Sequence, residues 1–239
     1  MRILNKQYVV LAGIGMLMLA LQASASVNKS VKVPDGGTAD GASSVNGSVT
    51  VGTYATINGD LETVNGSIRV GEGTTLGDAE TVNGSLRVGD GVHARNLETV
   101  NGKIQVGSNV TVEGEVTAVN GKIEIMSGSQ VARNVENVNG QIELSGARIA
   151  GGLTTVNGSV YLVDGAVVRG DLRVRKPNRS GWNNKNKKPK VVIGPGSRVE
   201  GVIELEQEVE LFLSDTAEVG GVTGVMSIDD AQRFSGDRP

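Results

Sequence analysis

The tripeptide Val-Asn-Gly recurs seven times at nearly even spacing, and this repeat constrains the fold more than any other feature of the chain. The intervals are 19, 18, 18, 19, 19 and 18 residues, and the repeats begin at Val45, Val64, Val82, Val100, Val119, Val138 and Val156. A fixed period of about 20 residues is typical of solenoids, in which each repeat is one unit that stacks on the next. The repeat therefore predicts one continuous elongated body.

Each repeat contains short segments in which apolar residues occupy every second position, and this period indicates β-strands. Examples are Ile68-Arg69-Val70 after the Asn-Gly corner and Leu61-Glu62-Thr63 before it. A second apolar site follows a glycine-rich turn and is occupied by Leu76, Val112, Val131 or Val168. Because successive repeats run in one direction, equivalent strands must pair in parallel. We predict an all-β fold, a single-stranded parallel β-solenoid with three sides and 18–19 residues per coil. It should be right-handed, as parallel crossovers usually are.

The Asn-Gly corners are predicted to form a column along the stack. Both residue types tolerate positive φ, which suits a corner, and amides at the spacing of stacked strands can hydrogen-bond to one another. The corner asparagines are Asn46, Asn65, Asn83, Asn101, Asn120, Asn139 and Asn157. Two orientations of the neighbouring valine stay open. Strict alternation from Leu61 puts Val64 outward and Asn65 inward, whereas a change of parity at the corner, the favoured alternative, buries the valine. An outward valine column would be an apolar ridge suited to interaction or polymerisation.

The N-terminal residues are typical of a secretory signal. Arg2 and Lys6 precede an apolar run from Tyr8 to Leu21, and small residues follow, so we expect a signal peptide over residues 1–25 with cleavage after Ala25. The run is shorter than the roughly 20 residues that cross a bilayer, which disfavours an uncleaved anchor. The chain has no cysteine, so neither a lipid anchor on cysteine nor a disulfide is available. We expect an exported protein in the periplasm, on the outer surface or secreted, with no transmembrane segment in the mature chain.

The remaining boundaries follow from the repeat. Residues 26–44 are predicted to be a polar segment or cap, residues 45–224 the solenoid, and residues 225–239 a C-terminal cap or tail. Ser227-Ile228-Asp229-Asp230 resembles a capping box and predicts a short helix through Phe234 that covers the last coil.

A basic insertion interrupts the repeat at residues 175–190, where a Val-Asn-Gly corner would stand, and it is about 12 or 13 residues longer than the equivalent stretches. A basic loop with one tryptophan could bind a polyanion, an anionic lipid or a glycan, whereas the alternative is a solvated loop without a ligand. The candidate binding residues are Arg173, Arg175, Lys176, Arg179, Trp182, Lys185, Lys187, Lys188 and Lys190.

Equivalent positions are predicted to form surface columns. One runs through Arg69, Arg87, Gln105, Glu124 and Glu143, and another through Glu62, Glu80 and Glu98. Repeated glutamates are typical of a solvated solenoid face, so a catalytic carboxylate pair is disfavoured. His93 is the only histidine, and Asp60, Asp78, Asp90 and Asp164 do not share one column as a calcium-binding roll requires. We expect no catalytic residue, no metal site and no cofactor.

Val199-Glu200-Gly201-Val202-Ile203 and the repeated Val-Gly-x-Gly turns resemble bactofilin-type polymer-forming bacterial β-helix proteins and the solenoid repeats of bacterial adhesins, over roughly residues 45–224. The resemblance is one of repeat style. It implies a right-handed helix that polymerises end to end without catalysis. Bactofilins act on the cytoplasmic side, however, and the apparent export signal of this chain departs from that pattern.

The expected function is a non-enzymatic, exported structural or interaction module of the cell envelope that can self-assemble. The alternative is a surface protein that binds a polyanion or glycan through the basic loop, and a carbohydrate-active β-helix enzyme comes third. The expected partners are a second copy of the chain, end to end or laterally, and an anionic envelope polymer or lipid. Nucleic acid is disfavoured.

Overall fold

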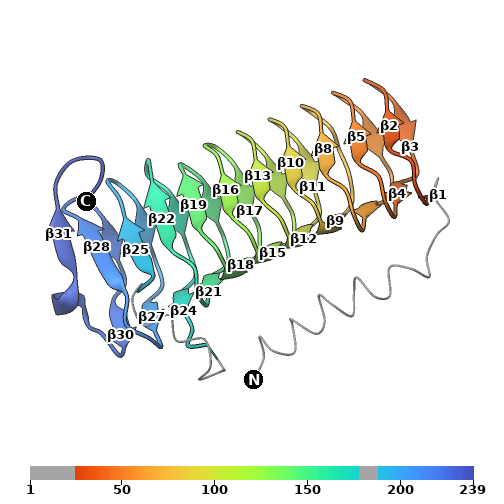
Figure 1. Ribbon diagram of the computed structural model, residues 1–239. Helices are drawn as coiled ribbons and strands as arrows, with labels where there is room; N and C mark the ends of the chain where they lie inside the picture. Colours follow the sequence, from red (N-terminus) through yellow and green to blue (C-terminus); the bar gives the residue numbers. More distant parts are fainter. Residues whose placement is uncertain (1–24, 178–187) are drawn as a thin grey trace.

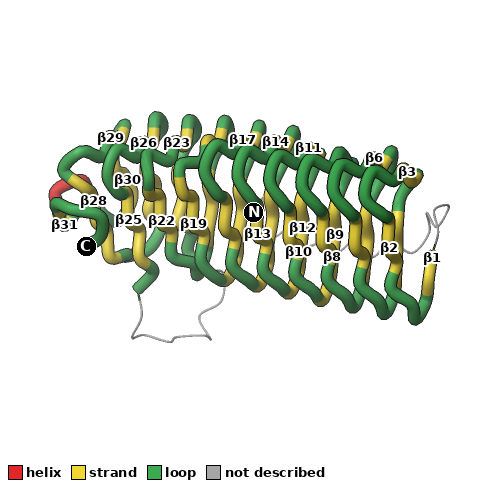
Figure 2. The backbone as a smooth tube through the Cα atoms, turned by 90° about the horizontal axis from the view of Figure 1, so that it is seen from above, coloured by secondary structure: helices red, strands yellow, loops and turns green. Residues whose placement is uncertain are grey.

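The computed structural model describes residues 25–177 and 188–239, which form one stack of parallel coils (Figure 1). Each coil places short strands in successive sheets, and every strand pairing in the described chain is parallel. Seen from above in Figure 2, equivalent strands of successive coils follow one another along the rod. The all-β parallel solenoid is thus confirmed. Its handedness and three-sided cross-section stay predictions. The expected signal peptide lies outside the described residues except for Ala25.

Two sheets contain eleven strands each. The first sheet consists of β1 (Ala25–Ser26), β4 (Ala42–Ser44), β7 (Leu61–Thr63), β9 (Ala79–Asn83), β12 (Leu97–Asn101), β15 (Val116–Asn120), β18 (Val135–Asn139), β21 (Leu153–Thr155), β24 (Leu172–Val174), β27 (Ile203–Leu205) and β30 (Val222–Gly224). The second sheet consists of β2 (Val31–Val33), β5 (Val49–Val51), β8 (Ile68–Val70), β10 (Leu86–Val88), β13 (Ile104–Val106), β16 (Ile123–Ile125), β19 (Ile142–Ser145), β22 (Val160–Val163), β25 (Lys190–Ile193), β28 (Glu210–Ser214) and β31 (Gln232–Phe234).

The third sheet has shorter strands. Seven of them pair in one run: β11 (His93–Ala94), β14 (Thr111–Val112), β17 (Gln130–Val131), β20 (Arg148–Ile149), β23 (Val167–Val168), β26 (Arg198–Val199) and β29 (Glu218–Val219). Two more, β3 (Thr38–Ala39) and β6 (Thr56–Ile57), pair with each other, and bridges through Thr75 connect β6 to β11. A single 3-10 helix, η2 (Ile228–Asp230), completes the described elements.

The core is a column of aliphatic side chains from all three sheets. In the second sheet, both apolar residues of each strand turn inward, so Ile104 and Val106 are buried while Gln105 between them is not. Leu61, Ala79 and Leu97 occupy the equivalent inward position of the first sheet and are fully buried. Burial of each such large aliphatic side chain contributes about 1.5–3 kcal/mol. The second apolar site is also confirmed, because Leu76, Val112, Val131 and Val168 all lie in the core.

The corner asparagines form a continuous hydrogen-bonded ladder, as expected. In each step the Nδ2 group of one asparagine donates to Oδ1 of the asparagine one coil earlier, at 2.8–2.9 Å. The ladder also includes Asn28, which the repeat did not identify because Lys29 replaces the glycine. It runs through Asn28, Asn46, Asn65, Asn83, Asn101, Asn120, Asn139 and Asn157.

The glycine of the corner is required by close approach between coils, not by positive φ as expected. Among the described Val-Asn-Gly corners, only Gly140 has a positive φ, at 129°. A Cβ atom on Gly84 would lie 1.8 Å from the carbonyl oxygen of Gly66, and one on Gly102 would lie 1.9 Å from that of Gly84. Any larger residue would therefore push the stacked corners apart.

Thr63, Thr81 and Thr99, which precede three of the corners, also bond to the preceding coil. The hydroxyl of Thr81 donates to the carbonyl of Gly66 at 2.9 Å, and that of Thr99 donates to Gly84 at 3.1 Å. These hydroxyls are buried, so the bonds satisfy polar groups that would otherwise destabilise the core. Asn137 takes this position farther along and its amide donates to Gly121.

The valine column of the corners is only partly buried. None of the seven valines belongs to the core cluster, although Val100 and Val119 are only 8% exposed and the other five are half-buried. The favoured alternative, in which the valine is buried, therefore holds for Val100 and Val119 and only in part for the other five. Strict alternation is wrong at the next residue, because it places Asn65 inward and Asn65 is exposed. The asparagine faces away from the core, and the threonine before the valine faces inward.

Both ends of the solenoid differ from the expected boundaries. Residues 25–44 already form four strands, so the stack begins before residue 45. At the other end the backbone N–H of Ser227 donates to Asp230 at 2.8 Å, as a capping box requires, but the helix ends at Asp230. Gln232–Phe234 then adds strand β31 to the second sheet, so the expected helix through Phe234 is wrong. The C-terminus extends the sheet.

Candidate binding site at the base of the inserted loop

The inserted loop leaves the stack between the first and second sheets, at the place of a Val-Asn-Gly corner. Four residues (156–159) connect β21 to β22, whereas fifteen (175–189) connect β24 to β25. The pairing of β24 with β21, and of β25 with β22, continues across the insertion. The insertion therefore adds to the corner without disturbing the stack, as the sequence predicted.

The structure describes five of the nine candidate binding residues. Arg173 lies in β24, Arg175 and Lys176 follow it, and Lys188 and Lys190 stand where the chain returns. The other four, Arg179, Trp182, Lys185 and Lys187, lie outside the described residues.

Acidic side chains of the next coil neutralise three of these five cations. Arg173 Nε lies 2.7 Å from Glu204 and its Nη2 lies 2.5 Å from Asp171. Lys188 Nζ lies 2.6 Å from Glu208, and Lys190 Nζ lies 3.3 Å from Glu210.

Two of these contacts also shift the pKa of Arg173, Lys188 and Glu208. The hydrogen bond to Glu204 raises the pKa of Arg173. The bond between Lys188 and Glu208 raises the pKa of the lysine and lowers that of the glutamate. Each pair thus favours its charged form, which leaves less positive charge at the base of the loop for an external anion.

The acidic coil was missed by the sequence interpretation. Its alternating glutamates are Glu204, Glu206, Glu208 and Glu210, and the stacking register places this stretch directly after the insertion. The signal was available, because two stretches that occupy the same corner in successive coils must be neighbours. A basic insertion followed one coil later by alternating glutamates indicates internal charge pairing.

Gln207 binds the backbone on both sides of the insertion point. Its Nε2 group donates to the carbonyl of Val156 at 2.6 Å and to that of Arg175 at 2.8 Å. The neighbouring Glu206 accepts a hydrogen bond from the backbone N–H of Lys176 at 3.1 Å. Within the described chain, Nε of Arg175 is buried without a hydrogen-bond partner. These contacts fix the point at which the loop leaves the solenoid.

The outward column of the second sheet becomes apolar beside the loop. The predicted order of Arg69, Arg87, Gln105, Glu124 and Glu143 is confirmed by the strand register. It continues through Tyr161, Val192 and Phe212. Lys190 Nζ lies 5.4 Å from the centre of the Phe212 ring, which is within cation–π distance. This lysine therefore contacts both an aromatic ring and Glu210.

The second predicted column, of glutamates on the first sheet, is also confirmed. Glu80 adjoins Glu62 on one side and Glu98 on the other. Burial, and repulsion from Glu98 and nearby carboxylates, raises the pKa of Glu80 to about 7. Asp60 and Asp78 also stack here, since the backbone N–H of Asp78 donates to Asp60 at 2.8 Å, and Arg95 contacts both aspartates. These two aspartates share a column, whereas Asp90 and Asp164 contact Ser108 and Ser145 in other turns, so the four do not form one column.

His93 lies 2.8 Å from Glu113 on the exposed surface of the third sheet. Among residues 25–177 and 188–239, no group of three or more His, Cys, Asp or Glu side chains is placed to hold a metal ion. In the same residues, no helix is long and apolar enough to cross a bilayer.

Comparison with known protein families, with curated proteins and with solved structures gave no match to this chain.

Proposed function

We propose that this chain is a non-enzymatic, exported structural module of the cell envelope that self-assembles through the ends of its solenoid. The observation that carries the proposal is an apolar core that is incompletely covered at both ends. Export is supported by the charge, apolar run and small residues of the first 25 positions. The place of action is the periplasm, the outer surface or the medium.

The partly covered apolar residues gather in the terminal coils. Those that pack on the core while remaining half-exposed are Val31 and Ala39 in the first coils, and Ala217, Val219, Val222, Met226 and Ala231 in the last. Val27, Val225 and Ile228 are 65%, 58% and 40% exposed at the same two ends. Contact between the ends of two copies would remove this apolar surface from water, which favours association.

The strand edges support the same contact. β2 and β31 are the outermost strands of the second sheet, so each has one edge without a strand partner in the described chain. An open edge offers backbone donors and acceptors to another chain. An end-to-end contact uses two different surfaces, so it does not close on itself and generates a filament.

A proline at the first edge tests the proposal without removing a bond between coils. Val31 donates its N–H to Ser48, and the carbonyl of Val33 accepts from Gly52, so both residues bond to the second coil. In a parallel strand the residue between them directs its N–H to the opposite edge, and that residue is Lys32. Lys32→Pro removes this donor, whereas Lys32→Ala keeps it and serves as the control.

Purified residues 26–239 should sediment faster as concentration rises and should form rods of increasing length in electron micrographs. Lys32→Pro should remain monomeric with an unchanged β-sheet circular dichroism spectrum, while Lys32→Ala should assemble. A folded wild-type chain that stays monomeric at every concentration would contradict the proposal.

The second candidate function is binding of a polyanion or glycan by the basic loop. It is supported by the run of basic residues and by exposed Lys176, and it is weakened by the pairing of Arg173, Lys188 and Lys190 with glutamates. Retention on an anionic matrix that is lost when the loop is deleted would favour this function over assembly.

A further inference from the structure

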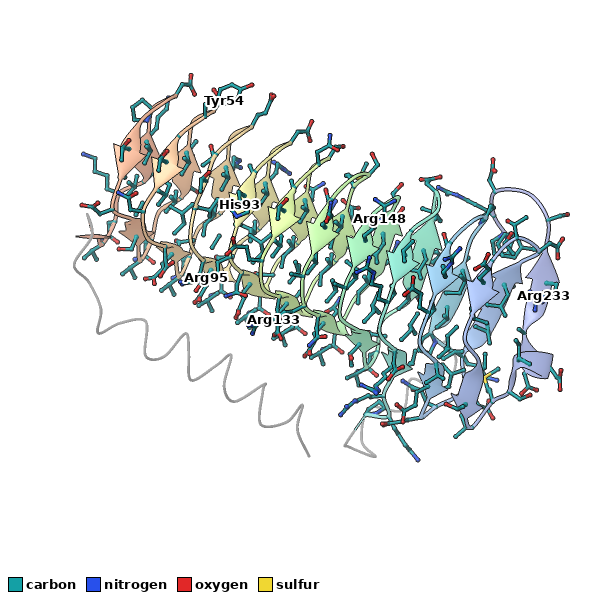
Figure 3. The ribbon with its side chains drawn as sticks, turned by 180° about the vertical axis from the view of Figure 1, so that it is seen from behind. Tyr54, His93, Arg95, Arg133, Arg148 and Arg233 are labelled. Carbon is teal, nitrogen blue, oxygen red and sulfur yellow. The ribbon has the colours of Figure 1, made fainter. Side chains whose placement is uncertain are left out.

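We infer that the third sheet carries an anion-binding patch, formed by Arg133, Arg148 and Arg169, that binds phosphomonoester groups. The patch is independent of the inserted loop and of end-to-end assembly. Arg148 lies in β20, while Arg133 and Arg169 follow β17 and β23 on the two flanking coils. All three side chains are exposed, and Arg133 and Arg148 are labelled in Figure 3.

The register brings these residues together around a centre without large side chains. Gln130 pairs with Arg148, and Arg148 pairs with Val167. Two residues farther along each coil stand Ala132, Ala150 and Arg169, and Arg133 stacks on Gly151 through the hydrogen bond from Gly151 N–H to the Arg133 carbonyl. Arg133 and Arg169 stand in the bends just after β17 and β23, on coils that lie about 4.8 Å to either side of the coil of Arg148. Extended arginine side chains can reach one common anion from these positions.

The three patch arginines belong to the cations of the described rod that form no ion pair. Arg95, Lys103, Lys122, Arg173 and Arg198 all form ion pairs within the solenoid. Among the residues that the structure describes, no carboxylate pairs with any of the three patch arginines. The ranges outside the description contain no Asp or Glu, so they cannot supply one.

The acids around the patch are engaged elsewhere or stand at its border. Glu113 contacts His93 at 2.8 Å, Glu115 accepts from Asn134 at 3.3 Å, and Asp171 contacts Arg173. Glu200 follows Arg169 in the next coil without forming an ion pair with it, and it marks the C-terminal border of the patch.

The guanidinium groups of the patch favour a phosphate ligand. Guanidinium groups bind phosphate oxygens through paired, charge-assisted hydrogen bonds. The backbone N–H groups of Gly151 and Gly170 already donate to Arg133 and Gly151, so the patch offers only side-chain donors. Three exposed positive charges within about one Debye length attract a doubly charged group more strongly than a singly charged one. A phosphomonoester fits this requirement, whether it is carried by a free phosphate compound or by a lipid headgroup.

The test measures binding of inorganic phosphate, whose dianion has the charge of a phosphomonoester, to residues 26–239 at low and high salt. Binding should weaken as ionic strength rises. Replacing all three patch arginines by glutamine should weaken it by about tenfold or more, since several charge-assisted bonds are lost. Arg69→Gln is the matched control, because Arg69 is an exposed arginine of the second sheet without an ion pair, and it should bind as the wild type does. Glu200→Gln should strengthen binding.

A variant with Lys185→Gln and Lys187→Gln separates the patch from the loop, because it lowers the loop charge and should leave the patch affinity unchanged. Vesicles with phosphatidic acid, compared with phosphatidylcholine vesicles, distinguish a membrane source from free phosphate. Binding to either phosphate probe that depends on the three arginines supports the patch. Absence of binding to both probes, or an equal loss in Arg69→Gln, overturns it, and neither result bears on filament formation.

Discussion

The side-chain Nδ2 group of Asn101 donates to Oδ1 of Asn83, 2.9 Å away, in the middle of a ladder that crosses eight coils. Each amide inside this ladder donates one bond and accepts another. The contribution of a single step can be tested because aspartate keeps the acceptor and loses the donor.

Asn101→Asp should lower the free energy of unfolding by about 0.5–1.5 kcal/mol, the usual net contribution of one hydrogen bond. Asn28→Asp is the control, since Asn28 only accepts from Asn46 within the described ladder and aspartate still accepts. Urea unfolding of both variants measures the difference. Equal destabilisation would show that the ladder bonds do not account for the effect.

The corner glycines should be more sensitive to alanine than the glycines of the other turns. A Cβ atom on Gly102 would lie 1.9 Å from the carbonyl oxygen of Gly84, whereas one on Gly91 would meet nothing within 4 Å. Gly91 has a φ of +63°, so alanine there costs only the strain of a left-handed backbone, about 1–2 kcal/mol. Gly102→Ala should cost about 3 kcal/mol or more because the stacked coils must separate. Thermal unfolding of the two variants gives the order, and a smaller loss for Gly102→Ala would contradict it.

The glutamate column predicts that stability falls as pH rises towards neutrality. The pKa of Glu80 is raised to about 7 by burial and by Glu98, Asp78, Glu62 and Asp60, with Arg95 the cation that contacts the aspartates. A raised carboxyl pKa means that the folded state holds the proton more tightly than the unfolded state does. Stability is therefore full below the unfolded pKa and declines as pH rises through about 7.

Glu80→Gln should remove this dependence. At pH 8 the variant should be more stable than the wild type by about 1 kcal/mol, because solvent screening reduces the effect of the full pKa difference. At pH 4 the two should unfold at similar denaturant concentrations. A variant less stable than the wild type at pH 8 would show that the carboxylate is stabilised by a neighbour.

Gln207 should stabilise the two coils between which the inserted loop leaves the solenoid. Gln207→Ala removes two hydrogen bonds and leaves the carbonyls of Val156 and Arg175 without this donor, which should destabilise the last coils by about 1–3 kcal/mol. Hydrogen exchange should quicken in β24 and β25 and remain unchanged in β8 and β10. Uniformly faster exchange along the rod would indicate global destabilisation.

The regular parts of the fold could be predicted because a fixed period determines which residues meet. The Asn101 to Asn83 bond and the neighbouring pair of Arg69 and Arg87 both follow from counting one coil along the sequence. Counting does not give orientation at a corner, where the strand alternation is broken. Val64 is half-buried and Asn65 is exposed for this reason, and neither alternative described both residues correctly.

The composition of the insertion alone did not reveal its charge pairing, which follows only when the acidic stretch one coil later is placed beside it by the repeat. The basic residues of the insertion suggested a free cationic loop, but Glu204, Glu208 and Glu210 pair with three of its five described cations. The patch of Arg133, Arg148 and Arg169 carries no motif, and only the coil register brings its members together. Residues that form one surface site on a solenoid come from neighbouring coils, so they lie about 18 or more residues apart in the sequence.

Every amide of the asparagine ladder points the same way along the rod, with the donor on the later coil and the acceptor on the earlier one. The aligned side-chain dipoles therefore add, and the two ends of the row are chemically different. Within residues 25–177 and 188–239, the ladder leaves the donor of Asn28 unused at its start and the acceptor of Asn157 unused at its end, where Lys176 takes the next position. The row of amides therefore has a dipole along the rod axis. Two copies that join head to tail align their dipoles, whereas two copies that join head to head place dipole ends of the same sign together.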